Sequence, residues 1–198
     1  MTTATPTSIG TVGNATEQER ATATVLAAFM ADPITRWFLP DAQQYLKYFP
    51  AVLQGMCGPA FEGRSAFYAG DFYGAALWLR PGAEPDNDVL GALMQEAIPE
   101  PQQESRFAFF EQMATHHPEE ALWYLPMIGV DPAYQGAGLG STLLSHALAE
   151  CDREHMPAYL EATSPRSHDL YLRHGFEVVG VIQAADSPPM FPMLRKAR

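Results

Sequence analysis

Cysteine is scarce in this chain of 198 residues, and no apolar run is as long as a membrane span. The two cysteines, Cys57 and Cys151, lack the spacing of metal-binding or redox pairs. We therefore expect reduced thiols with structural roles, no metal site and a cytoplasmic location. The longest apolar stretch, residues 121–130, has about half the length that a spanning helix needs, so we expect no membrane segment.

Positive charge is also scarce, because 12 lysines and arginines face 23 aspartates and glutamates, for a net charge of −11. Phosphate backbones and anionic lipids would repel such a chain, which excludes nucleic acid and membrane surfaces as expected partners. A cationic small molecule is mildly favoured. The first twenty residues have no basic segment followed by an apolar core, so we expect no secretory signal.

Hydrophobic periodicity predicts helices that alternate with strands. The Asp32-Pro33 pair should end the first helix, and Pro50 should kink or break the second. The predicted helices cover residues 17–31, 41–57, 89–97, 104–114, 138–154 and 168–174, and the predicted strands cover residues 65–69, 73–79, 121–130, 158–162, 177–182 and 190–195. The strand–helix–strand order of the second half predicts a parallel pair of strands.

A glycine-rich segment, Gln135-Gly136-Ala137-Gly138-Leu139-Gly140-Ser141, joins a predicted strand to an amphipathic helix. Such a junction presents unpaired backbone N–H groups and the positive end of the helix dipole to one point, which suits a phosphate or pyrophosphate. The segment lacks the Lys-Ser/Thr ending of a nucleoside-triphosphate loop. It also lacks the glycine at the sixth place of a dinucleotide fingerprint. Both common phosphate motifs are therefore disfavoured.

The strand before this loop contains Pro126, which cannot donate a ladder hydrogen bond, and Gly129, which favours a bulge. Both residues predict that the pairing of the strand is interrupted. Backbone groups left free along such a strand can pair with an extended ligand that contains amides. A phosphate seat at the end of this strand would suit a pantetheine arm with its pyrophosphate.

Two motifs resemble those of the GNAT-type N-acetyltransferase superfamily. The acetyl-CoA signature Q/R-x-x-G-x-G/A appears as Gln135-Gly136-Ala137-Gly138-Leu139-Gly140, and a tyrosine shortly before Gly-Phe appears in Leu170-Tyr171-Leu172-Arg173-His174-Gly175-Phe176. The likeness covers residue 121 to the C-terminus. The segments at residues 75–78, 123–132 and 159–166 resemble most closely the puromycin N-acetyltransferase branch.

The resemblance implies that the backbone of the glycine loop binds the pyrophosphate of acetyl-CoA. The cofactor residues it implies are Ile128, Gly129, Val130, Gln135, Gly136, Ala137, Gly138, Leu139, Gly140 and Ser141. Ser164 and Ser167 occupy the two places where the family often has an asparagine for the pantetheine. A hydroxyl offers a shorter reach than an amide there. Backbone donors of Ile128 and Val130 would orient the thioester or stabilise the oxyanion.

The same resemblance makes Tyr171 the general acid that protonates the departing thiolate. Glu161 matches a glutamate of the puromycin-type branch, and a half-buried carboxylate with a raised pKa can act as the general base. Alternative bases precede the interrupted strand, at His116, His117, Glu119 and Glu120. For the acceptor pocket we favour Trp37, expected in a loop after a helix, and Tyr124, on the interrupted strand.

The resulting expectation is an α/β (α+β) fold with a mixed, mostly antiparallel sheet that splays at its central parallel strand pair and is flanked by helices. Residues 1–198 would form a single N-acetyltransferase domain, with a loose segment at 1–16 that carries at most one short strand and an acetyl-CoA-binding core at about 121–182. A monomer or homodimer would transfer acetyl from acetyl-CoA to a small-molecule amine by direct attack in a ternary complex. A non-catalytic acyl-CoA sensor and a dinucleotide-dependent oxidoreductase remain as alternatives, and the acceptor's identity stays open.

Overall fold

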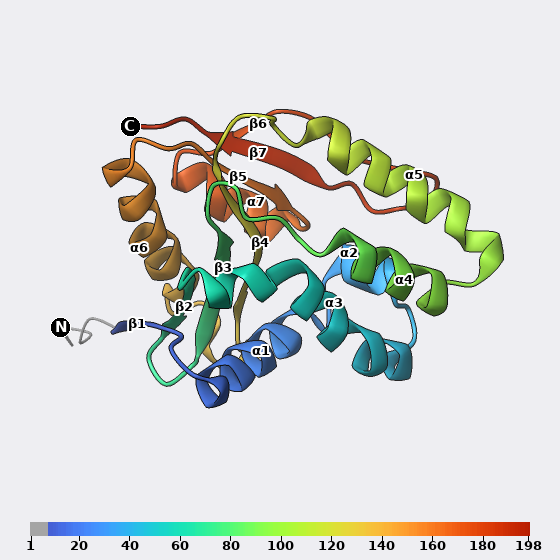
Figure 1. The fold of residues 1–198 in the computed structure, drawn as a ribbon, viewed down its shortest axis with the longest axis horizontal. Coiled ribbons are helices and arrows are strands. Elements are labelled where there is room, and N and C mark those ends of the chain that lie inside the picture. The colour runs from blue at the N-terminus through green and yellow to red at the C-terminus, as the bar shows by residue number, and fades with distance from the viewer. Residues whose placement is uncertain (1–7) are drawn as a thin grey trace.

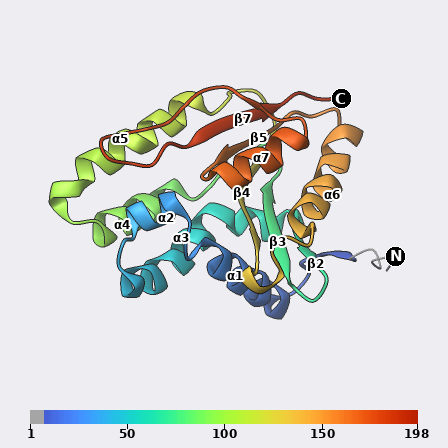
Figure 2. The ribbon, with the colours of Figure 1, turned by 180° about the vertical axis from the view of Figure 1, so that it is seen from behind.

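A computed structural model describes residues 8–198 of the chain, which form a seven-stranded sheet with helices on both faces (Figures 1 and 2). The elements in chain order are β1 (Ile9–Thr11), α1 (Ala15–Phe29), α2 (Pro33–Phe38), α3 (Ala42–Glu62), β2 (Ala66–Ala69), β3 (Gly74–Leu79), α4 (Asn87–Ala97), α5 (Glu100–His116), β4 (Trp123–Val130), η1 (Pro132–Tyr134), α6 (Leu139–Arg153), β5 (Ala158–Ala162), α7 (Pro165–Arg173), β6 (Glu177–Val178) and β7 (Phe191–Arg195). In the described residues, no helix is both long and apolar enough to cross a bilayer.

The strand order is β1-β2-β3-β4-β5-β7-β6, and β4 and β5 form the one parallel pair of this sheet in the described part of the chain. β4 has eight residues, yet it pairs with β5 only over Trp123–Leu125. Beyond Leu125 the two strands separate. The predicted mixed, mostly antiparallel sheet, splayed at its central parallel pair, is therefore confirmed.

Alternating side chains of the central strands feed two cores on opposite faces of the sheet, as the period of two in a strand requires. On β3, Leu77 contributes to the core under α1 and α3, whereas Trp78 contributes to the core under α6 and α7. A smaller third cluster joins α2, α5 and the segment before β7 around Ile34, Phe109 and Met190. These packed layers hold the ends of α1, α6 and α7 around the point where the sheet splays.

The second predicted helix ends near Cys57 and has a kink or a break at Pro50, whereas α3 continues without a break through Pro50 to Glu62. Proline removes the hydrogen bond to the carbonyl of Leu46, and this residue lies on the exposed face of the helix, since Leu46 is 63% exposed. Phe49 and Leu53 are buried on either side and hold the helix against the core. Tertiary packing thus outweighs the local cost of the proline.

Some other element bounds also differ from the sequence predictions. The Asp32-Pro33 pair ends α1 as expected, but it also starts the short helix α2, with Asp32 as N-cap and Pro33 in the first turn. Trp37 therefore lies on a helix, and the prediction of a loop was wrong. α5 and α7 begin earlier than predicted. The strand predicted at residues 177–182 is shorter in the structure, where β6 covers Glu177–Val178 and Ile182 forms an isolated bridge with Met190. β1 is the short strand expected within residues 1–16, of which residues 1–7 lie outside the described part.

Candidate functional site

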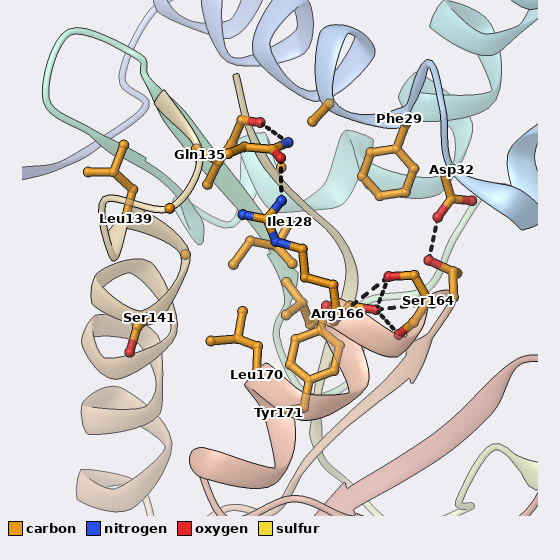
Figure 3. A pocket seen from close by; sticks show the side chains of 18 of the residues that line it. Phe29, Asp32, Ile128, Gln135, Leu139, Ser141, Ser164, Arg166, Leu170 and Tyr171 are labelled. Carbon is orange, nitrogen blue, oxygen red and sulfur yellow. Dashed lines mark hydrogen bonds between the residues drawn. The ribbon is translucent and has the colours of Figure 1, made fainter. Parts of the chain in front are cut away.

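A cavity of about 380 Å³ lies where β4 and β5 separate, and it is lined by the end of α1, the splayed part of β4, the glycine loop with the start of α6, and α7 (Figure 3). Phe29 and Asp32 lie on one side of this cavity, and Leu139 and Ser141 lie on the other (Figure 3). Its volume falls at the small end of the range for ligand sites, roughly 300–1,000 Å³. The splayed sheet is therefore hollowed at the position that the sequence predicts.

The free edge of β4 presents backbone groups to the cavity. The N–H of Asp131 donates to the carbonyl of Tyr73 at 2.9 Å, in register with the β3–β4 ladder. Because successive residues of a strand alternate in direction, Gly129 also faces β3, whereas Ile128 and Val130 face the edge that β5 has left. The carbonyl of Val130 accepts a hydrogen bond from Gln135 Nε2 at 3.1 Å, as an unpaired edge group should.

Pro126 and Gly129 have different structural roles in β4. The register against β3 shifts by one residue between Leu77 and Leu79, opposite the segment that contains Pro126. The bulge therefore lies at this segment and not at Gly129, where the sequence predicts it, because Gly129 pairs with Ala75 in regular register. Gly129 is needed for another reason, because a Cβ there would lie 2.7 Å from the Cβ of Ala28 on α1. Its lack of a side chain lets α1 pack directly on the splayed strand.

The glycine loop gives α6 an N-terminus without a side-chain cap. Gly136 and Gly138 have φ values of +86° and +83°, a conformation that other residues rarely adopt. The first intrahelical bond runs from the N–H of Thr142 to the carbonyl of Gly138. The N–H groups of Leu139, Gly140 and Ser141 are consequently free of intrahelical partners and aligned with the positive end of the helix dipole.

Two arginines of α7 add positive charge on the glycine-loop side of the cavity. Arg166 donates to Gln135 Oε1 at 2.6 Å. Arg173 also lines the cavity and precedes His174, whose Nε2 is 2.7 Å from the Ser141 hydroxyl at the start of α6. This side of the cavity can therefore bind an anionic group although the whole chain is acidic.

Tyr171 projects from α7 into the same cavity and is only 5% exposed (Figure 3). Burial raises the pKa of its phenol well above the usual value, and the nearby carboxylates of Asp32 and Glu161 raise it further. The side chain stays protonated at neutral pH. It can therefore donate a proton to a thiolate held in the cavity.

Ser164 and Ser167 line the cavity, but both hydroxyls also cap α7. The Ser164 hydroxyl accepts from the N–H of Ser167 at 3.2 Å, and the Ser167 hydroxyl accepts from the N–H of Ser164 at the same distance. This reciprocal capping box stabilises the start of the helix. The local structure thus accounts for both serines without a ligand.

Glu161 lies on β5 beside the splay and lines the cavity. Its Oε2 accepts a hydrogen bond from the Tyr124 hydroxyl at 2.9 Å. Burial raises the pKa of this carboxyl to about 7, although the bond from Tyr124 works in the opposite direction. A carboxyl with this pKa can accept a proton near neutral pH.

Not every residue predicted from the sequence lies at this cavity. Those that line it are Ile128, Gly129, Val130, Gln135, Gly136, Gly138, Leu139, Gly140, Ser141, Glu161, Ser164, Ser167 and Tyr171, whereas Ala137, Tyr124, Trp37, His116, His117, Glu119 and Glu120 are not among its lining residues. Tyr124 reaches the site only through Glu161. Trp37 instead packs against Phe38 and Phe109, and its indole donates to Asp186 at 3.0 Å.

Sequence reasoning missed Phe29 and Asp32, which enter the cavity from the α1–α2 junction. In the sequence the Asp32-Pro33 pair indicates a helix boundary, and this pattern does not indicate that Asp32 lines a cavity. The contact with the cavity depends on the packing of α1 against Gly129, across about a hundred residues of sequence.

Comparisons with known proteins agree with this geometry. Residues 55–176 match the acetyltransferase (GNAT) family. The chain is 25% identical over 176 residues to an uncharacterised N-acetyltransferase of Schizosaccharomyces pombe, covering 82% of this chain and 71% of that protein.

Solved structures show the same fold. One, described as histone acetyltransferase HPA2 and related acetyltransferase from Corynebacterium glutamicum, has a TM-score of 0.70 and 24% identity, covering 97% of both chains. The arylalkylamine N-acetyltransferase 2 of Aedes aegypti has a TM-score of 0.68 and 12% identity, covering 98% of this chain and 100% of that one. With the family match over more than half of its length, this chain belongs to the GNAT family of acetyltransferases.

Proposed function

We propose that this protein transfers the acetyl group of acetyl-CoA to the primary amine of a small molecule, by direct attack of the amine in a ternary complex. The observation that carries the proposal is the convergence of three features on one cavity. These are the uncapped start of α6, the free edge of β4 and the buried phenol of Tyr171. We further propose that residues 1–198 act as one acetyltransferase domain in the cytoplasm. The unpaired, buried thiols of Cys57 and Cys151 are consistent with that compartment.

The described residues fit the two chemical parts of acetyl-CoA. The N–H groups of Leu139, Gly140 and Ser141 would hold the pyrophosphate, with Arg166 and Arg173 adding charge attraction. Ile128 and Val130 would pair with the amides of the pantetheine as an additional strand does. When bound, acetyl-CoA supplies an activated thioester carbonyl to the centre of the cavity.

Glu161 and Tyr171 would carry out the proton transfers of the reaction. Glu161 accepts the proton that the attacking ammonium must lose, and the amine nitrogen then forms a bond to the thioester carbon. As the carbon–sulfur bond breaks, Tyr171 donates its proton to the departing thiolate, and its phenolate then takes up the second proton that the acylated nitrogen must lose. Backbone N–H groups of the β4 edge would stabilise the negative charge on the oxygen during the attack.

The acceptor that fits this site best is a small aromatic or hydrophobic amine. Phe29 supplies an apolar surface on the side of the cavity opposite the start of α6 (Figure 3). The resemblance to the puromycin N-acetyltransferase branch points to the same chemical class. So does the name of the Aedes aegypti structure, an arylalkylamine N-acetyltransferase.

Thiol release from acetyl-CoA over a panel of amines tests the proposal, with Tyr171→Phe compared against wild type. Loss of the proton donor should lower kcat by about 100-fold or more, whereas the Kd for acetyl-CoA should change less than about twofold. Tyr68→Phe, on β2 away from the cavity, is the matched control and should leave both values unchanged.

An unchanged kcat in Tyr171→Phe would remove this residue from the mechanism. Binding of acetyl-CoA by wild type, with no thiol release for any amine of a broad panel, would favour a non-catalytic acyl-CoA sensor.

A further inference from the structure

Asp32 is a half-buried carboxylate that faces the cavity and can accept a further hydrogen bond from a cationic group there. Its Oδ1 accepts the N–H of Thr35 at 2.9 Å, and its Oδ2 accepts the hydroxyl of Thr163. Figure 3 shows this second bond beside the ring of Phe29. A carboxylate has about four lone-pair sites, and Oδ2 accepts one hydrogen bond, from Thr163, so this oxygen keeps room for a further donor from the cavity.

The negative charge of Asp32 is not required for its role in capping α2. Asparagine caps a helix about as well as aspartate, because one side-chain oxygen is sufficient. Asp41 caps α3 with one oxygen that accepts from Gln43 and Gln44, and this residue is exposed and outside the cavity. The cap therefore explains the oxygen at position 32 and leaves its charge unexplained.

Within residues 8–198, no lysine, arginine or histidine forms an ion pair with Asp32 or Glu161. A buried charge without a counter-ion is costly, and burial accordingly raises the pKa of Asp32. The hydroxyl of Thr163, on the β5–α7 turn, fixes the position of this carboxylate at the cavity. A cation supplied by a ligand would remove the cost of this arrangement.

We propose that Asp32 is a specificity-determining residue that binds the reacting ammonium group of the acceptor and selects protonated amines with an aromatic substituent over neutral nucleophiles. The inference rests on the proposed acetyl transfer and assigns to this transfer an acceptor class. Asp32 holds the ammonium, Phe29 contacts its substituent, and Glu161 accepts the proton. Asp32 itself keeps no proton during the reaction.

The test compares benzylamine, a cation at neutral pH, with phenylhydrazine, a nearly isosteric but uncharged nucleophile. Asp32→Asn removes the charge and keeps both the volume and the cap. The KM for benzylamine should rise at least about tenfold, which corresponds to about 1.4 kcal/mol, with kcat within about threefold. The KM for phenylhydrazine and the Kd for acetyl-CoA should stay within about twofold. Asp41→Asn, which also changes an aspartate cap, should alter none of these values.

An equal change in KM for both acceptors, or no change for either, would overturn the inference. A second measurement uses the unaltered protein saturated with CoA, so it does not depend on the folding of the variant. N,N-dimethylbenzylamine, a cation that cannot form a stable amide, should bind at least about tenfold more tightly than neutral benzyl alcohol in calorimetry. Equal affinities would also contradict the role of Asp32.

Failure of this inference is distinguishable from failure of the proposed function. If only Asp32 lacks the role, wild type still binds acetyl-CoA and releases thiol without preferring the cation. If the proposed function itself fails, acetyl-CoA does not bind, or no acceptor supports thiol release.

Discussion

Glu161 and Tyr171 face the cavity from β5 and α7, and burial changes their pKa values in the same direction. Burial favours the neutral form of both acids, so each pKa rises. The two raised pKa values have opposite consequences for proton transfer, because a carboxyl and a phenol have different ordinary pKa values. Tyr171 becomes a phenol that is protonated throughout the neutral range, whereas Glu161, with a pKa of about 7, becomes a carboxyl that exchanges its proton within that range. The same buried environment thus makes Tyr171 a proton donor and Glu161 a proton acceptor.

The pH dependence of kcat/KM should report Glu161. A base acts only when it is unprotonated, so kcat/KM should rise with pH around a midpoint of about 7 and level off above it. The measurement needs an acceptor whose own ionisation lies outside this range. Glu161→Gln should lower kcat/KM by about 100-fold and abolish the rise.

Glu119→Gln, an exposed alternative base in the segment before β4, should keep the wild-type profile. If Glu161→Gln retained the rise near pH 7, another group would be the base.

At the scale of elements, β4 combines pairing with a free edge because its sequence supports both. Its first three residues pair with β5, the segment with Pro126 bulges, and Ile128 and Val130 then face the cavity while Gly129 admits α1. The same close packing of α1 brings Phe29 and Asp32 to the cavity. The site thus depends on a contact between two elements that are distant in sequence.

Gly129→Ala tests this contact through the stability of the fold. The added methyl would lie 2.7 Å from the Ala28 Cβ, so α1 or β4 must shift, and the free energy of unfolding should fall by about 1–3 kcal/mol. Urea denaturation measures the change. In Gly91→Ala, on α4, the methyl meets open space, and a helix-interior alanine should be neutral or stabilising by up to about 1 kcal/mol. Equal stabilities of the two variants would contradict the close packing.

Gly138→Ala separates the binding role of the glycine loop from its conformational role. Gly138 and Gly82 share a φ of +83°, and in both cases a methyl would meet open space. Either alanine variant should therefore lose about 1–2 kcal/mol of stability through backbone strain alone. Only Gly138→Ala redirects the N–H groups that begin α6, so only this variant should weaken acetyl-CoA binding, by roughly tenfold. If calorimetry gave the same acetyl-CoA affinity for both variants, the glycine loop would have no role in binding the cofactor.

The sequence predicts the elements that have strong local signals. The apolar stripe of α6, the hairpin of β2 and β3, and the glycine loop each follow from a short stretch of residues. The six residues of α2 are too few for a periodic pattern, and the continuity of α3 across Pro50 depends on the burial of Phe49 and Leu53. For the same reason Asp32 could not be placed at the site, because its surroundings are created by tertiary packing. Ser164 and Ser167 are the opposite case, because their role in capping α7 is local and does not depend on tertiary packing.

For the molecule as a whole, the cavity brings opposite charges together within an acidic protein. Arg166 and Arg173 lie on the side of the glycine loop, where anionic phosphates are expected, while Asp32 and Glu161 supply the negative charge that an ammonium needs. The net charge of −11 would favour the approach of a cationic acceptor. The splayed sheet would allow the proposed cofactor and the proposed acceptor to reach a single cavity.

Titration calorimetry of the purified protein with acetyl-CoA, with NAD as the control, tests whether the cavity binds this cofactor. We expect one acetyl-CoA to bind per chain with micromolar affinity and NAD to give no heat of binding. An absence of acetyl-CoA binding would mean that the glycine loop is only a turn between β4 and α6, and the proposed acetyl transfer would be contradicted.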